Sequence, residues 1–310
     1  FSLLFFSLIY EFTGEHPMAF HLFNLLFYGI LVVLLYKWFL DIFRKKKYRY
    51  WIATLSALIF AVHPVHTEVV ANIKGMDELF ALLFAVLAAR WSLKGVDQKT
   101  SVLRAQLLAG LFFFIGLMSK ENTITFLAVI PLSIYFFRGR HLKLSLRAIA
   151  GPLIATIVFL GIRFSILGSS FGEAPLELMN NPFLKWTGDA YVRMDFLEKG
   201  PMILYSLAMY LWLFIVPHPL SHDYYPLEIP PTSFSDPVVL LSLLAYSLLI
   251  AGVIYFWKGK PWLSFGLLFF LASLSIVSNI VFPVGTNMSE RFLFMPSVGL
   301  SIAAGGALMQ

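Results

Sequence analysis

The 310-residue sequence contains no cysteine, which excludes disulfide bonds, zinc–thiolate sites, iron–sulfur clusters and a thiol nucleophile. Charge is also scarce, because 13% of the residues are charged, whereas a typical soluble domain has about 25%. The sequence has no Gly-x-x-x-x-Gly-Lys phosphate loop and no Gly-x-Gly-x-x-Gly dinucleotide motif. A nucleotide-driven mechanism therefore has no support, and the Ser, His and Asp residues of the outer loops support a serine hydrolase only weakly.

Apolar and aromatic side chains dominate the chain. Hydrophobic residues make up 59% and aromatic residues 17%, and the mean hydropathy is +0.80. The length would hold about ten segments of about 20 residues, which is what one crossing of a bilayer needs. We predict an all-α polytopic membrane protein, with apolar segments near residues 18–42, 50–63, 76–95, 103–119, 122–138, 147–167, 201–217, 238–257, 261–281 and 292–310.

The placement of positive charge predicts the orientation of these segments. The net charge of +6 does not indicate nucleic-acid binding, because most basic residues lie in short connections between apolar segments. Residues 44–49, 90–104, 138–147 and 258–260, together with Lys37, hold 16 of the 23 Lys and Arg residues, so we place them on the cytoplasmic side. Only Asp41 and Asp97 of the 17 acids lie there. The remaining acids face the outer side, and chemistry on that side is one candidate explanation for their excess.

One apolar segment interrupts the alternation of sides. Residues 201–217 leave an outer loop and lead into PHPLSHDYYPLEIPP, which contains no Lys or Arg and is also typical of an outer loop. A full crossing would place Lys258 and Lys260 outside, against the positive-inside bias. We therefore predict that 201–217 is a re-entrant or interfacial helix within a single transmembrane domain over 1–310.

The first outer polar cluster follows the segment 50–63. His63, His66 and Glu68 lie around Pro64, which breaks a helix, and Asn72 shares a helical face with Glu68. Ionisable residues at membrane depth indicate substrate binding or proton handling. Interfacial capping is the alternative. A divalent metal is less favoured, because the proline disrupts the helical face that a zinc motif uses, and we predict no metal and no other cofactor.

Two further outer clusters contain paired charges. Lys120 and Glu121 lie between two apolar segments. Arg163 in an otherwise apolar segment either extends to the membrane surface from the outer end of that segment or requires an anion or a carboxylate as partner. Lys120 could hold a phosphate or belong to an exposed turn. Asp223 lies in the outer loop after 217, and Glu290 and Arg291 introduce the last segment, where a capped helix start is the alternative explanation.

In their order along the chain, these motifs resemble the membrane portion of the transmembrane and tetratricopeptide repeat-containing proteins, which are O-mannosyltransferases of the GT-C superfamily. The resemblance covers nearly the whole chain. It rests on FHLFNLLFY, FAVHPVHTEVVANIKGMDELFALLF, GLMSKENTIT, Asn181-Pro182, LSHDYYP and SNIVFPVGTNMSERFLFMPSVG. Where the family usually has Gly-Arg-Ala-Asp, this chain has Lys74-Gly75-Met76-Asp77, which keeps the acid and displaces the basic residue.

The resemblance implies a GT-C-type helix bundle with short interfacial helices on the outer face. It also implies transfer of a sugar with inversion, from a polyprenyl-phosphate carrier to Ser or Thr hydroxyls of proteins, at a lumenal or periplasmic face. The family's principal catalytic carboxylate lies in a first outer loop that would mostly precede Phe1, and its repeats would follow Gln310. We therefore expect a fragment that lacks the first transmembrane helix and these repeats, and that could by itself be inactive.

The transfer needs a carboxylate that accepts a proton and cations that hold the phosphate. We predict that Glu68 and Asp77 are catalytic. The residues that we predict to bind substrate are His63, His66, Lys120, Glu121, Arg163, Asp223, Glu290 and Arg291. The expected partners are the bilayer, the lipid-linked donor and a protein acceptor. A lipid or polysaccharide acceptor is the alternative enzyme, and a transporter is less favoured. Short loops favour a bacterial inner membrane over the endoplasmic reticulum.

Overall fold

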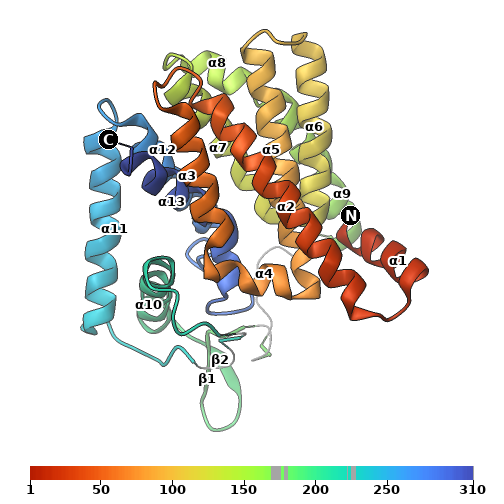
Figure 1. Cartoon of the computed structure of the whole chain (residues 1–310). Coiled ribbons are helices and arrows are strands. Elements are labelled where there is room, and N and C mark those ends of the chain that lie inside the picture. The colour runs from red at the N-terminus through yellow and green to blue at the C-terminus, as the bar shows by residue number, and fades with distance from the viewer. Residues whose placement is uncertain (169–175, 178–180, 222, 225–227, 310) are drawn as a thin grey trace.

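The computed structural model describes residues 1–168, 176–177, 181–221, 223–224 and 228–309, and it confirms the predicted all-α polytopic membrane architecture (Figure 1). The α-helices are α1 (Ser2–Thr13), α2 (Pro17–Ile42), α3 (Arg49–Val62), α4 (Thr67–Ala71), α5 (Met76–Val96), α6 (Val102–Ser119), α7 (Phe126–Phe137), α8 (Leu142–Arg147), α9 (Ala150–Leu167), α10 (Phe196–Ile215), α11 (Pro237–Phe256), α12 (Pro261–Ser275) and α13 (Phe294–Ala307). The 3-10 helices are η1 (Pro64–His66), η2 (Ile73–Gly75), η3 (Glu121–Thr125) and η4 (Glu290–Leu293). Strands β1 (Leu184–Trp186) and β2 (Tyr191–Arg193) form an antiparallel hairpin, in which Lys185 pairs with Val192.

Four helical segments are long and apolar enough to cross a membrane. They are α2, the combined segment of η2 and α5, α6 and α11. Helix α3 and the segment Pro64–Ala71 pass the same test together and are bent by 55° relative to each other. Each of the ten apolar segments predicted from the sequence contains a helix.

Helix α10 contains most of the segment 201–217 that we predicted to be re-entrant. Asp195 and Glu198 form a capping box that starts it. In Figure 1 this helix is strongly foreshortened, whereas α11 beside it runs along the height of the bundle. Helix α10 thus lies across the direction of α11. This orientation supports an interfacial or re-entrant helix, which stays a prediction.

The two acids on the basic side of the chain are both paired with arginine. Asp41 at the end of α2 accepts a hydrogen bond from Nε of Arg90 at 2.9 Å. Asp97, after α5, accepts from Arg138 at 2.7 Å and pairs with Arg44 at 2.7 Å. The side chains of Arg138 and Asp97 are each only 3% exposed. Through its contacts with Arg44 and Arg138, Asp97 therefore joins the ends of α2, α5 and α7 within the protein.

Small residues allow the helices of the core to approach closely. Helix α12 meets α13 at Gly266 and Gly299, where a Cβ atom on either glycine would overlap the carbonyl oxygen of the other. Close backbone contact through glycine is typical of helix pairs in membranes, where dispersion contacts stabilise association. The pair α12–α13 therefore fixes the position of η4, which leads into α13.

We predict that Gly299→Val destabilises the protein by about 1–3 kcal/mol, because the added side chain forces α12 and α13 apart. A thermal melt in detergent, followed by tryptophan fluorescence, measures the change. Gly161→Val is the matched control, since a Cβ atom at Gly161 in α9 meets nothing within 4 Å. An equal melting temperature for both variants would contradict the close contact.

Candidate active site

The chain breaks its helices repeatedly at the end of the bundle opposite the basic loops. Pro64 follows α3, and the His63 Nδ1 atom accepts a hydrogen bond from the Val65 amide at the start of η1. The Asn72 side chain accepts from the Lys74 amide at the start of η2. Asn24 in α2 donates to the carbonyl oxygens of Val70 and Asn72, at 3.3 and 2.7 Å. These side chains satisfy backbone groups that the broken helices leave unpaired.

A cavity of about 560 Å³ opens where these short helices meet η4 and the loop after α10. A volume of this size suits a small ligand or a lipid headgroup. It is lined by His21, Thr67, Glu68, Ala71, Asn72, Ile73, Leu220, Ser221 and Glu290. Two carboxylates thus reach one cavity from α4 and from η4.

Glu68 is held by the segment that starts η4. Its carboxylate accepts hydrogen bonds from the Ser289 hydroxyl at 3.0 and 3.1 Å, and from the Arg291 amide at 2.7 Å. The Arg291 guanidinium lies 3.6 Å from Glu68 Oε1. Because the Glu68 side chain is only 6% exposed, these donors compensate for much of its lost hydration.

Glu290 is held by the loop that follows α10. Its Oε1 atom accepts hydrogen bonds from the Ser221 amide at 2.6 Å and from the Tyr224 hydroxyl at 3.1 Å. Burial raises the pKa of the Glu290 carboxyl, the two hydrogen bonds lower it, and the nearby Glu68 carboxylate raises it. The net shift is upward, so Glu290 keeps its proton to a higher pH than an exposed glutamate does.

A side chain in the loop before η4 shapes the backbone there. Asn279 has a φ of 60°, a left-handed conformation that asparagine adopts more readily than most residues. Its amide donates to the carbonyl oxygens of Thr286 and Asn287, and its side-chain oxygen accepts from the Val284 amide. One side chain therefore closes the loop that delivers Ser289 to Glu68.

Lys120 lies between two neighbouring carboxylates. Its Nζ atom is 2.7 Å from Glu78 Oε1 and 3.3 Å from Asp77 Oδ2, and Glu78 also accepts a hydrogen bond from Asn122. Burial lowers the pKa of the Lys120 ammonium, but the Glu78 and Asp77 carboxylates raise it by more, so the net shift is upward. Lys120 is therefore a permanent cation at this end of the bundle.

Glu121 and Arg163 form an ion pair with each other. A carboxylate partner was one of the alternatives that the sequence left open for Arg163, and Glu121 provides it. Their side chains are 57% and 35% exposed, and neither residue lines the cavity. Their role in substrate binding stays a prediction.

The two histidines that we predicted as substrate ligands lie away from the cavity. His66 is 2% exposed, and its ring nitrogens lie 3.1 Å from the Tyr28 hydroxyl and 2.9 Å from the Ser297 hydroxyl. The His63 ring stacks on Phe214 and its Nε2 atom donates to the Phe214 carbonyl at 2.8 Å. Both imidazoles join elements of the bundle, so their positions give their predicted role no support.

Asp223, also predicted to bind substrate, is exposed, and its carbonyl oxygen accepts a hydrogen bond from the Ser221 hydroxyl. Its neighbours His222 and Tyr225 in the LSHDYYP motif lie outside the described residues. Within the described part of the chain, no three His, Asp or Glu side chains are placed to share a metal ion.

Sequence reasoning missed several residues of the site. Glu78 received no role, although it follows Asp77 directly at the start of α5. Ser289 and Ser221 were noted only as parts of motifs, and the structure shows them donating to the two cavity carboxylates. The sequence features that could have revealed them are the adjacent acids Asp77 and Glu78 at a helix start and the serine directly before Glu290.

The chain is similar to proteins named as protein O-mannosyl-transferases. It is 26% identical to one from Caenorhabditis elegans over 96% of this chain and 40% of the relative. It is 24% identical to TMTC3 of Mus musculus, over 97% of this chain and 34% of the relative, and 28% identical to TMTC4 of Homo sapiens, over 93% and 44%. These relatives confirm the family resemblance.

The chain spans less than half the length of these relatives. No family model matches the sequence. No solved structure matches it either.

We predict that Lys120→Met lowers the free energy of unfolding by about 3–5 kcal/mol, because it leaves the Glu78 carboxylate buried without its cation. The Glu78 side chain is 1% exposed. Denaturant titration in detergent measures the loss, and the double variant Lys120→Met with Glu78→Gln should recover most of it. The matched surface change, Glu121→Gln, should cost less than about 1 kcal/mol.

The raised pKa of Glu290 also predicts a pH dependence. The folded protein binds this proton more tightly than the unfolded chain does, so the contribution of Glu290 to stability falls as pH rises from about 4.5 through its raised pKa. Glu290→Gln should remove this part of the dependence. Melting temperatures of both proteins across pH 4.5 to 8 test it, and parallel curves would show that Glu290 titrates normally.

Proposed function

We propose that the chain forms the membrane part of a glycosyltransferase that moves mannose from a polyprenyl-phosphate carrier to Ser or Thr hydroxyls of proteins. The observation that carries the proposal is the cavity with Glu68 and Glu290, in a chain similar over nearly its full length to proteins named O-mannosyl-transferases. The cavity lies at an end of the bundle, where the headgroup of a lipid carrier would arrive.

The proposed reaction is a single displacement at the anomeric carbon. The acceptor hydroxyl oxygen attacks that carbon from the face opposite the phosphate, and the bond from carbon to phosphate oxygen breaks with its electron pair remaining on the phosphate. The hydroxyl proton passes to a carboxylate. The products are an O-mannoside of inverted configuration and polyprenyl phosphate.

Glu68 is the proposed proton acceptor of this chain. Its carboxylate lines the cavity, and two carboxylate oxygens offer about four acceptor positions, more than Ser289 and the Arg291 amide occupy. The same donors fix its orientation, which general-base catalysis requires. Glu290, with its raised pKa, is proposed to bind the sugar or acceptor hydroxyls together with His21 and Asn72.

Arg291 and Lys120 are the proposed cations for the phosphate. A leaving phosphate gains charge as its bond to carbon breaks, and fixed cations in a site of low polarity stabilise that charge. Arg291 reaches the cavity acid Glu68, and its charge also acts on Lys120. Asp77 was predicted to be catalytic, and its contact with Lys120 supports a positioning role instead.

The outer, lumenal face is the proposed location of this chemistry. The cavity lies at the end of the bundle opposite Arg44, Arg90 and Arg138, which the positive-inside bias places in the cytoplasm. The relatives described above come from animals. Their origin favours the endoplasmic reticulum over the bacterial inner membrane that the short loops favoured.

The test is mannose transfer in proteoliposomes supplied with polyprenyl-phosphate mannose and a Ser/Thr-rich peptide, followed by mass spectrometry of the peptide. Glu68→Gln should lower kcat by about a hundredfold or more, the usual contribution of a general base. Glu15→Gln is the control, because Glu15 is exposed at the turn before α2.

Three results would change the assignment. Unchanged turnover in Glu68→Gln would remove Glu68 as the proton acceptor. Transfer of the mannose to a lipid or glycan, with none to the peptide, would overturn the acceptor. Failure of the folded protein to consume the donor would overturn the activity.

A further inference from the structure

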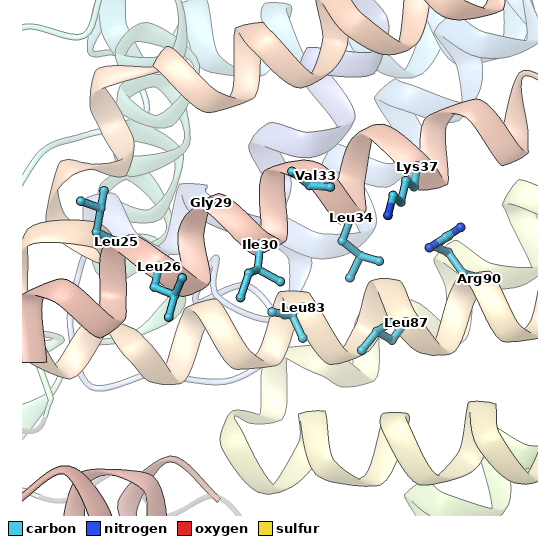
Figure 2. Close-up of a pocket in the computed structure, with 10 residues that line it drawn as sticks. All are labelled: Leu25, Leu26, Gly29, Ile30, Val33, Leu34, Lys37, Leu83, Leu87 and Arg90. Carbon is cyan, nitrogen blue, oxygen red and sulfur yellow. The ribbon is translucent and has the colours of Figure 1, made fainter. Parts of the chain in front are cut away.

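A second cavity lies on the membrane-spanning surface, between α2 and α5 (Figure 2). It has a volume of about 660 Å³, and its walls are aliphatic along most of their length. Leu26, Ile30 and Leu34 of α2 face Leu83 and Leu87 of α5 across it. Both helices are among the segments that can cross a bilayer, so the groove opens toward lipid.

Two cations mark the basic end of this groove. Lys37 of α2 and Arg90 of α5 line it, and Figure 2 shows their side chains directed toward each other across its end. Arg90 donates through Nε to Asp41 at 2.9 Å, and this bond leaves the two terminal nitrogens of the guanidinium as donors. Asp41 supplies one negative charge beside two positive ones. The end of the groove therefore carries a net positive charge that an anion would balance.

The groove has the depth of one leaflet. Leu26 and Lys37 are eleven positions apart, which is about 16 Å along a helix, and half of a typical hydrocarbon core is about 15 Å. A ligand that fits the aliphatic walls and the two cations has a long apolar chain within the membrane core and an anionic headgroup at the edge of that core. The cations lie on the side that the basic loops assign to the cytoplasm, where anionic lipids are enriched.

We propose that this groove binds an anionic phospholipid of the cytoplasmic leaflet, with one acyl chain between α2 and α5 and the phosphate between Lys37 and Arg90. The inference is independent of the proposed sugar transfer, because Lys37 at the charged end of the groove and His21 in the cavity of Glu68 lie toward opposite ends of α2. Charge complementarity distinguishes this ligand from a zwitterionic lipid, because a zwitterionic headgroup has no net charge to balance the net positive charge of Lys37, Arg90 and Asp41.

The headgroup end and the acyl-chain part of the groove can each be tested by substitution. Lys37→Gln removes a headgroup cation, and Lys37→Arg preserves it. Gly29 lies in the wall of the groove, and a Cβ atom there meets nothing within 4 Å, so Gly29→Leu would fill the space of the acyl chain without a clash. Gly161→Leu is the matched control in α9, since its Cβ atom also meets nothing within 4 Å.

The experiment is native mass spectrometry of the detergent-solubilised chain after incubation with equal amounts of phosphatidylglycerol and phosphatidylcholine that carry the same acyl chains. The wild type should retain more phosphatidylglycerol. Lys37→Gln should lower the ratio of the bound lipids by about fivefold, the contribution expected of one basic residue near an anionic lipid surface. Lys37→Arg should restore the ratio, and Gly29→Leu should reduce retention of both lipids while Gly161→Leu does not.

Several results would overturn the proposal. Equal retention of the two lipids by the wild type would remove the headgroup selectivity. A loss in Gly161→Leu as large as that in Gly29→Leu would show binding to the whole apolar surface. Displacement of the bound phosphatidylglycerol by an equimolar polyprenyl phosphate would assign the groove to a different lipid. The readout is lipid retention, so these results do not depend on sugar transfer.

Discussion

The contact of the Glu68 carboxylate with the start of η4 joins the two halves of the candidate site. Ser289 and Arg291 lie more than 220 residues after Glu68, and the Ser289 hydroxyl and the Arg291 amide both donate to its carboxylate. A buried carboxylate without donors would be costly in this apolar surrounding. Asn279 holds the loop that leads to Ser289, and Gly266 and Gly299 hold α12 against α13, the helix that follows η4. The cavity therefore depends on packing in the C-terminal helices as much as on its own lining.

Much of the fold could be predicted from the sequence, because long apolar segments and short basic connections are local properties. All ten apolar segments contain helices, and α3 ends where Pro64 predicted a break. Helices α7, α12 and α13 are shorter than a usual transmembrane helix, and the sequence does not show how neighbouring helices complete them. The direction of α10 depends in the same way on tertiary packing, which hydropathy does not describe.

The site was harder to predict than the fold. Glu68 and Glu290, two of the acids singled out from the sequence, line one cavity although they are far apart in the sequence, and their roles stay predictions. The sequence could not distinguish a histidine that binds a ligand from one that joins helices, and His66 contacts Tyr28 and Ser297 inside the bundle. Nor could it show that Lys120 lies between Asp77 and Glu78, because that contact joins α5 to the start of η3.

Asn24 shows how a membrane protein can contain a broken helix beside a site. Water is scarce at that depth, and a carbonyl group released by the break between α4 and η2 must find a donor in the protein. Asn24 provides that donor from a different helix, through its bonds to Val70 and Asn72. The irregular backbone around the cavity therefore depends on a donor from a distant segment. Because the acceptors are backbone carbonyls, this contact constrains the residue type at position 24 and not those at positions 70 and 72.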